Sequence, residues 1–278
     1  MAASATSQRA PLPTRAGVGD APLRGRHALV TGGGRGIGAA IAERLADLGA
    51  DLTLVGRSEG TLRREAECLR AAHGRKVATA VADVGDAEAL AAAFARARAA
   101  HGPPLILINN AGAVKSAAFL KTSRAMWEEM LAVNLTGAFL AVGEALPGML
   151  AAGWGRIVNI ASTAGLVGYR YVSAYSAAKH GLVGLTRSLA LELATKGITV
   201  NAVCPGYTDT DLVAGAVDAI AKATGMSVAE ARAELVKSNP QGRFITPAEV
   251  AAAVGWLCLP DSAAVTGQSI AVAGGEVM

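Results

Sequence analysis

The stretch His27-Ala-Leu-Val-Thr31-Gly32-Gly33-Gly34-Arg35-Gly36-Ile37-Gly38 decides the fold of this chain. Residues 27–31 are mainly apolar and predict a strand, and Ile37, Ile41 and Leu45 follow the glycines at helical spacing. A glycine-rich turn between a strand and a helix lets the backbone approach a pyrophosphate, which the amides and dipole of the helix N-terminus attract. The stretch therefore predicts a dinucleotide site, contacted by Gly32, Gly34, Arg35, Gly36, Ile37 and Gly38.

The rest of the chain repeats this alternation of strand and helix. Strands are predicted at 51–55, 77–82, 105–108, 156–161, 199–203 and 269–272, and helices at 59–73, 87–101, 127–150, 173–195 and 247–257. This pattern indicates an α/β fold of the Rossmann type, a doubly wound parallel sheet with helices on both faces. We expect a disordered leader at 1–24 and a single domain over 25–278, in which 206–243 forms a substrate lid.

The composition limits the classes of function. The chain has 278 residues, 52% of them hydrophobic, and a net charge of +4, but no basic run interleaved with aromatics, so nucleic-acid binding is not expected. Three scattered cysteines and four histidines show no metal-ligand spacing, so no metal site is expected either. No uninterrupted apolar run reaches the length of a membrane span. The leader lacks the apolar core of a secretory signal, although its acid-poor composition resembles a transit peptide. We expect a cytoplasmic protein that does not associate with membranes.

The end of the second predicted strand distinguishes between two dinucleotides. An NAD site usually has an acidic residue there to hold the ribose hydroxyls, but this chain reads Val55-Gly56-Arg57-Ser58. Arg57, and Arg35 in the glycine loop, can pair with a 2′-phosphate; otherwise each is a solvated surface charge. The sequence therefore predicts NADP(H), bound in part by Arg57 and Ser58, with NAD(H) as the alternative.

Tyr175 and Lys179 are four residues apart and would share one face of the helix predicted at 173–195. A cation about 4 Å from the phenol, at an effective dielectric of about 20, would favour the phenolate by roughly 4 kcal/mol, or about three pKa units. That shift would bring a phenol close to neutral pH, where a general acid or base works best. Ser162 could add a hydrogen bond to a substrate oxygen. The alternative interpretation of the pair is a solvated helix face.

Together these motifs resemble the short-chain dehydrogenase/reductase family, over nearly the whole chain from about residue 25. The motifs that match are Thr31-Gly32-x3-Gly36-x-Gly38, Ala82-Asp83-Val84, Asn109-Asn110-Ala111-Gly112, Asn134, Ser162 with Tyr175 and Lys179, Cys204-Pro205-Gly206 with Thr208 and Thr210, Thr266-Gly267-Gln268, and Gly274-Gly275.

The resemblance implies a role for each residue of a catalytic tetrad. Tyr175 would transfer the proton, and Lys179 would lower the pKa of that phenol and bind the nicotinamide ribose. Ser162 would position the substrate oxygen, and Asn134 would hold a water that links Lys179 to solvent. The cofactor contacts implied by the resemblance are Asp83, Val84, Asn110, Ala111, Gly112, Tyr175, Lys179, Pro205, Gly206, Thr208 and Thr210, with Asp83 and the amide of Val84 at the adenine.

The function implied is that of an NADPH-dependent carbonyl reductase acting on a small ketone, 3-oxoacyl thioesters included. Two alternatives remain: an NAD(P)-dependent dehydrogenase of secondary alcohols or 3-hydroxyacids, and a non-catalytic NADP(H)-binding sensor or scaffold, against which the intact tetrad argues. Residues 238–244 resemble both polyketide-type ketoreductases and 3-hydroxybutyrate dehydrogenases.

Several details bear on the substrate and the assembly. Ala273 stands where many relatives have Asp. Relatives that reduce 3-oxoacyl groups on acyl carrier protein often have two basic residues that dock the carrier. Lys196 matches one of these positions, but Gly153 stands at the other, which weakens the case for a carrier-bound substrate. Residues 169–171 are expected to face the pocket, where Arg170 could meet an acidic substrate group. The resemblance also implies a homotetramer, built by pairing the helices near 127–150 and 173–195.

Overall fold

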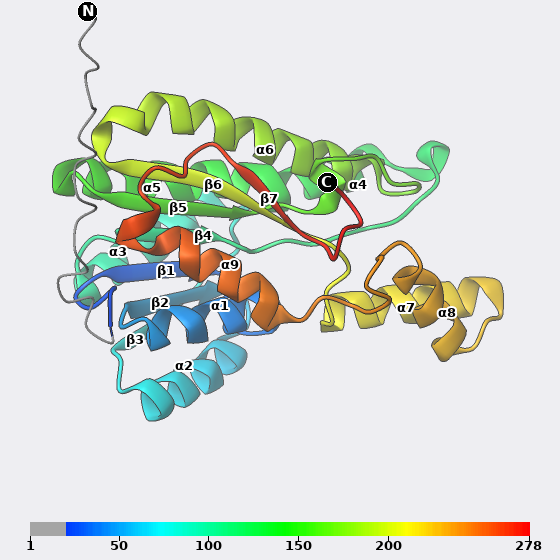
Figure 1. Cartoon of the computed structure of the whole chain (residues 1–278), viewed down its shortest axis with the longest axis horizontal. Helices are drawn as coiled ribbons and strands as arrows, with labels where there is room; N and C mark the ends of the chain where they lie inside the picture. Colours follow the sequence, from blue (N-terminus) through cyan, green and yellow to red (C-terminus); the bar gives the residue numbers. More distant parts are fainter. Residues whose placement is uncertain (1–20) are drawn as a thin grey trace, which may run out of the picture.

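Seven parallel strands form the sheet of the computed structural model, which describes residues 21–278 (Figure 1). Their order is β3-β2-β1-β4-β5-β6-β7, so the chain reverses direction across the sheet between β1 and β4. The strands are β1 (His27–Thr31), β2 (Asp51–Gly56), β3 (Val77–Val81), β4 (Ile106–Asn109), β5 (Gly155–Ile160), β6 (Ile198–Pro205) and β7 (Ser269–Val272). The predicted doubly wound α/β fold is confirmed, and such a sheet binds its ligand where the order reverses.

Helices cover both faces of this sheet. On one face lie α1 (Gly36–Asp47), α2 (Glu59–His73) and α9 (Pro247–Cys258), and on the other α3 (Ala87–His101), α5 (Gly137–Ala152) and α6 (Ser173–Leu193). Side chains of a strand alternate between the faces, so Val30 packs in the first layer and Leu29 in the second, both fully buried. The wholly buried β1 and β4 match the apolar strands expected of a sheet covered on both sides.

The helix predicted at 127–150 is interrupted in the structure. Helix α4 (Arg124–Leu131) runs into one π-helical turn, Ala132–Thr136, before α5 begins at Gly137. A π turn inserts an extra residue into the helix and changes the direction in which a side chain points, and such turns often occur at functional sites. Asn134 lies in this turn and is 2% exposed, so the interruption places it inside the protein.

One helical segment in the described part of the chain, Arg124–Ala152, is long and apolar enough to cross a membrane by length and composition alone. Its residues Ala141, Ala145 and Met149 are buried in the layer between α3, α5 and the sheet. The segment is therefore a core helix, and the charged Glu144 interrupts its apolar character.

The predicted lid contains two helices, α7 (Asp211–Thr224) and α8 (Val228–Val236), which project beyond the carboxyl edge of the sheet (Figure 1). They have a small core of their own, made by Val213, Val217, Ala231 and Phe244. This second core lets the lid keep its shape while few of its contacts reach the sheet.

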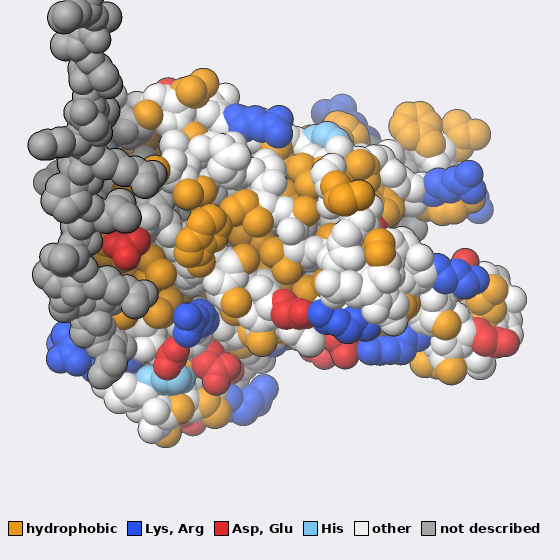
Figure 2. All heavy atoms as spheres, viewed as in Figure 1, with side chains coloured by type: hydrophobic (Ala, Val, Ile, Leu, Met, Phe, Trp, Pro, Cys, Tyr) orange, Lys and Arg blue, Asp and Glu red, His pale blue; other side chains and the backbone are white. Residues whose placement is uncertain are grey.

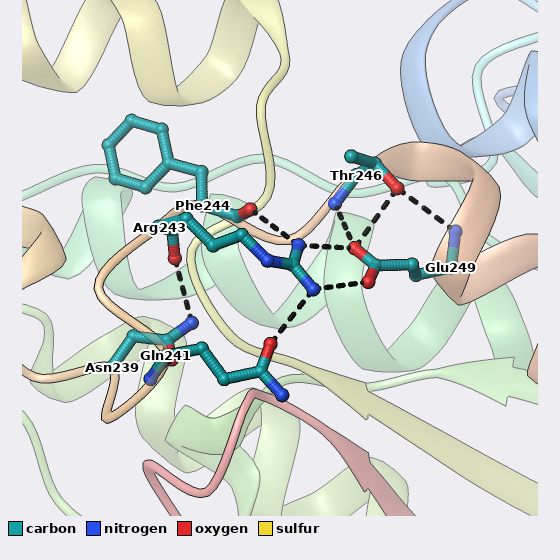
Figure 3. A network of polar contacts seen from close by, with 6 residues as sticks. All are labelled: Asn239, Gln241, Arg243, Phe244, Thr246 and Glu249. Carbon is teal, nitrogen blue, oxygen red and sulfur yellow. Dashed lines mark hydrogen bonds and ion pairs between the residues drawn. The ribbon is translucent and has the colours of Figure 1, made fainter.

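A polar network anchors the lid where the chain returns to the sheet (Figure 3). The Arg243 guanidinium binds both carboxylate oxygens of Glu249, at 2.8 and 2.5 Å. Glu249 also accepts from the backbone amide of Thr246, whose hydroxyl accepts from the Glu249 amide, so the pair caps the first turn of α9. Asn239 Nδ2 donates to the Arg243 carbonyl at 2.8 Å. The end of the lid is thereby joined to the start of α9.

The folded part of the chain begins before residue 25. Leu23 is fully buried, and its amide donates to the Leu48 carbonyl at 2.8 Å. The predicted boundary after residue 24 is therefore corrected: this leucine packs into the layer of α1 and α9. The remainder of the predicted leader, residues 1–20, lies outside the described residues.

Candidate active site

The glycine loop after β1 forms the floor of the candidate site. A Cβ atom at Gly38 would lie 2.1 Å from the Gly32 carbonyl oxygen, so α1 approaches the loop more closely than any side chain allows. Gly32 and Gly36 adopt φ values of +65° and +55°, which glycine tolerates best. The predicted Gly32, Gly36 and Gly38 thus shape one continuous turn, and Ile37 anchors it by packing against the core.

The turn after β4 is bonded to this loop. Asn110 Nδ2 donates to the carbonyls of Thr31 and Gly32, at 3.0 and 3.2 Å. In return the Thr31 hydroxyl accepts from the amides of Asn110 and Ala111, at 3.0 and 3.1 Å. Asn110 and Ala111 therefore hold the glycine loop in place, at the point where the strand order reverses.

The N-terminus of α1 fits an anion. Within residues 21–278 no side chain caps this helix, so the amides of its first turn remain directed at the loop. Arg35 precedes the helix and Arg57 follows β2, and the side chain of each is 74% exposed. Arg57 Nη1 lies 3.8 Å from Asp83 Oδ2, and Arg35 Nη1 lies 3.3 Å from Asp211 Oδ2. The uncapped helix N-terminus and the two exposed arginines are groups that could hold the phosphates of an NAD(P)(H) molecule.

The other predicted cofactor contacts lie in segments that follow the strands at the same edge of the sheet. Asp83 Oδ1 accepts from the Gly85 amide at 2.9 Å, which orients the carboxylate after β3. Val84 is buried against Gly137 of α5, where a Cβ atom would lie 2.9 Å away. On the opposite side, Thr210 packs against Gly36. After β1, Gly34 lies against Thr61 and Leu62, and the Ser58 hydroxyl is hydrogen-bonded to the Thr61 hydroxyl. At the end of β6 lie Pro205 and Gly206, and the Thr208 hydroxyl donates to the Gly206 carbonyl.

Two of the predicted catalytic residues, Asn134 and Lys179, lie beside Gly112. A Cβ atom on Gly112 would lie 2.9 Å from Asn134 Oδ1 and 3.7 Å from Lys179 Nζ. Asn134 Nδ2 donates to the Ala113 carbonyl at 2.8 Å, and Lys179 Nζ donates to the Ile160 carbonyl at 2.7 Å. Lys179 Nζ also lies 5.7 Å from the centre of the Tyr175 ring. The glycine therefore leaves space for Asn134 and Lys179, and Lys179 in turn lies against the Tyr175 ring.

The hydroxyl groups of Ser162 and Tyr175 are neighbours. Ser162 follows β5 and its hydroxyl accepts from the Ala164 amide at 3.1 Å, which fixes its side chain at the start of a short 3-10 turn. Burial raises the pKa of the Tyr175 phenol, and the neighbouring Ser162 hydroxyl acts in the opposite direction. The pair presents two hydroxyl groups to one location.

The electrostatics differ from the prediction that Lys179 brings the phenol towards neutrality. Burial lowers the pKa of Lys179 to about 8 and raises the pKa of Tyr175, so burial disfavours the charged form of both groups. The lysine lies over the ring and bonds to Ile160 instead of to the phenol oxygen. Desolvation of both groups therefore outweighs their mutual attraction.

Two features of the site have no signal in the sequence pattern. A buried chain of hydrogen bonds runs from Asn109 through Asn159 to Thr186, each link 2.8 Å long, and joins β4, β5 and α6 beneath the site. The Tyr169 hydroxyl donates to Glu276 Oε1 at 2.7 Å, which brings the C-terminal segment to the loop after β5. Of the residues expected to face the pocket, Arg170 and Tyr171 are exposed.

Metal ligands are not clustered in the described part of the chain. Among residues 21–278, no group of three or more His, Cys, Asp or Glu side chains is placed to hold an ion.

The fold and the site define an oxidoreductase that acts on CH–OH or C=O groups with NAD(P)(H). Residues 26–235 match the short chain dehydrogenase family, and the chain belongs to that family. It is 44% identical over 250 residues to the granaticin polyketide synthase putative ketoacyl reductase 1 of Streptomyces violaceoruber, covering 89% of this chain and 92% of the relative. It is 43% identical over 231 residues to a D-beta-hydroxybutyrate dehydrogenase of Cupriavidus necator, covering 83% and 89%. A solved actinorhodin polyketide ketoreductase variant with NADPH is 40% identical and superposes with a TM-score of 0.87 over 90% of this chain and 97% of that one.

Proposed function

We propose that this protein is an NADPH-dependent carbonyl reductase that transfers a hydride to a ketone, 3-oxoacyl groups included. The observation that carries the choice of coenzyme is the position of Arg57 at the end of β2, where its exposed guanidinium can pair with a 2′-phosphate. Arg35 supplies a second cation from the glycine loop. The similar ketoreductase solved with NADPH supports the same choice.

The side chains of the site divide the proton chemistry among them. The bound nicotinamide would supply the hydride. Ser162 donates a hydrogen bond to the substrate carbonyl oxygen and orients it, and Tyr175 gives that oxygen its phenolic proton. Lys179, whose pKa of about 8 lies near physiological pH, replaces the proton and binds the nicotinamide ribose. Asn134 holds the water through which Lys179 exchanges protons with solvent.

Initial rates with a panel of ketones, measured once with NADPH and once with NADH, test this proposal. We expect kcat/KM to be larger with NADPH for every ketone that is reduced. Turnover of no ketone and no alcohol, combined with tight NADPH binding, would instead favour the sensor or scaffold.

A dehydrogenase of secondary alcohols or 3-hydroxyacids is the second candidate. The D-beta-hydroxybutyrate dehydrogenase relative favours it, because its identity to this chain is almost that of the ketoacyl reductase. Equal use of NADH and NADPH, with faster oxidation than reduction at neutral pH, would select this candidate.

We propose a homotetramer in the cytoplasm. Two apolar faces support the assembly: Phe139 of α5 and Leu191 of α6 are 61% and 82% exposed, and Trp256 of α9 is 46% exposed beside β7 at the edge of the sheet. Hydrophobic side chains gather over β7 and α9 in Figure 2. Two different self-complementary faces are what a tetramer of dihedral symmetry needs. Sedimentation of Leu191→Glu should give dimers if α5 and α6 form one interface, and a monomeric parent protein would refute the assembly.

A further inference from the structure

Glu276 joins the C-terminal segment to the loop that follows the catalytic serine. The residue comes after β7, and its Oε1 accepts the hydroxyl of Tyr169 at 2.7 Å. Its neighbours are fixed as well, because a Cβ atom at Gly274 would lie 2.2 Å from Asn239 Oδ1 in the lid. The carboxylate is therefore held between the catalytic loop and the lid.

The second carboxylate oxygen of Glu276 lies against the turn after β6. A Cβ atom at Gly206 would lie 2.8 Å from Oε2. This oxygen is buried and has no hydrogen-bond partner among residues 21–278. A buried carboxylate oxygen without a donor is costly, so a ligand that brings a donor to it gains affinity.

The charge of Glu276 also reaches the surroundings of the catalytic phenol. Burial raises the pKa of Tyr207, and the charge of Glu276 raises it further. Tyr207 is in turn one of the groups that raise the pKa of Tyr175. Glu276 is thus linked through Tyr207 to the electrostatic surroundings of the catalytic phenol, whereas the side chain of Arg170 is exposed.

On the basis of the proposed carbonyl reductase, we propose that Glu276 is a specificity-determining residue. It rejects ketones that carry a free carboxylate and favours neutral ketones or those with a hydrogen-bond donor. Two negative charges in a site shielded from water repel each other strongly, so the discrimination arises from repulsion as much as from attraction. A site that must satisfy a buried acceptor also discriminates against ligands that lack a donor.

The test compares acetoacetate with ethyl acetoacetate, which present the same ketone with and without a negative charge. The parent protein should show a higher kcat/KM for the ester. Glu276→Gln keeps an acceptor for Tyr169 but removes the charge. In this variant the ratio of kcat/KM for the ester to kcat/KM for acetoacetate should fall at least about tenfold, because KM for acetoacetate becomes lower. Glu276→Asp should keep the ratio high, and so should Glu67→Gln, a control at an exposed position on α2.

The outcomes separate this inference from the proposed function. If the parent protein reduces neither compound, nor any other ketone, with NADPH, the proposed reductase fails and the inference with it. If it reduces the ester but Glu276→Gln leaves the ratio unchanged, only the role of Glu276 is overturned. Should Glu276→Gln be unfolded by circular dichroism, Glu276→Ala provides the same comparison, and a ratio equal to that of the parent overturns the inference.

Discussion

Lys179 Nζ lies 5.7 Å from the centre of the Tyr175 ring, one helical turn away on α6, and donates its hydrogen bond to the Ile160 carbonyl. The spacing of the two residues is therefore that of a catalytic pair, but the ammonium does not contact the phenol oxygen. With both groups buried, the phenol keeps its proton at neutral pH and can act as an acid towards a carbonyl oxygen. This state suits reduction, in which the enzyme must give up a proton.

Replacing Tyr175 by Phe removes that proton without changing the shape of the ring. We expect kcat for ketone reduction to fall by about 10²- to 10⁴-fold, the range usual for loss of a general acid. NADPH binding, followed by fluorescence titration, should persist. Tyr171→Phe is the matched control, because Tyr171 is 62% exposed. Full turnover by Tyr175→Phe would exclude the phenol as the proton donor.

Replacing Arg57 by Ala tests the coenzyme preference. A charge-assisted hydrogen bond is worth about 1.5–3 kcal/mol, so KM for NADPH should rise roughly ten- to hundredfold. Kinetics with NADH should change little, because NADH lacks the 2′-phosphate. Arg63→Ala is the control, since Arg63 is an exposed arginine of α2 paired with Glu59. The interpretation of Arg57 is wrong if both coenzymes are affected equally.

The fold could be predicted because its determinants are local in the sequence. The apolar strand at 27–31, the glycines and the apolar helix positions after them each carry a periodic signal, and alternation of such units allows few topologies. The candidate catalytic residues beside Gly112 carry no such local signal: Asn134 and Lys179 lie on helical elements, and their roles are implied by the family resemblance.

The features of the fold and the site that the sequence does not predict depend on burial and on contacts between distant segments. The π turn at Asn134 leaves the apolar pattern unchanged, so the pattern predicts one continuous helix there. The raised pKa of Tyr175 depends on burial, which the i, i+4 spacing of a tyrosine and a lysine does not reveal. The Tyr169–Glu276 contact joins residues 107 positions apart, and neither residue type signals it.

The ion pair of Arg243 and Glu249 should contribute modestly to stability. Arg243 and the capped helix lower the pKa of Glu249 to about 2, so its contribution is present above about pH 4.5 and is lost as the pH falls towards 2. Both side chains are more than a third exposed, at 46% and 39%, so solvent screens the pair and we expect only a small favourable coupling energy at neutral pH. A double-mutant cycle of Arg243→Ala and Glu249→Ala, followed by urea unfolding, measures it. A coupling energy of zero would show that the network of Figure 3 only reflects packing.

His27 predicts a second pH dependence, remote from the site. It is 3% exposed at the start of β1, and its two ring nitrogens bond to the Gly102 carbonyl at 2.8 Å and the Thr53 hydroxyl at 2.9 Å. The carbonyl can only accept, so Nδ1 carries the hydrogen and Nε2 accepts from Thr53, which satisfies a neutral imidazole. The ring of His101 lies edge-on at 5.2 Å, and Asp51 is the nearby carboxylate.

Burial lowers the pKa of His27 from 6.5 to about 4. Between these two pH values the imidazole is protonated in the unfolded chain and neutral in the folded protein. The free energy of unfolding should therefore fall as the pH drops from 6.5 to 4, by about 1.4 kcal/mol per pH unit and about 3 kcal/mol in total from this group. His27→Gln should remove this part of the slope in urea unfolding measured at several pH values, even if it lowers stability at pH 7. The exposed His180→Gln should keep the slope, and a His27→Gln protein with the parent slope would show that His27 does not limit stability in acid.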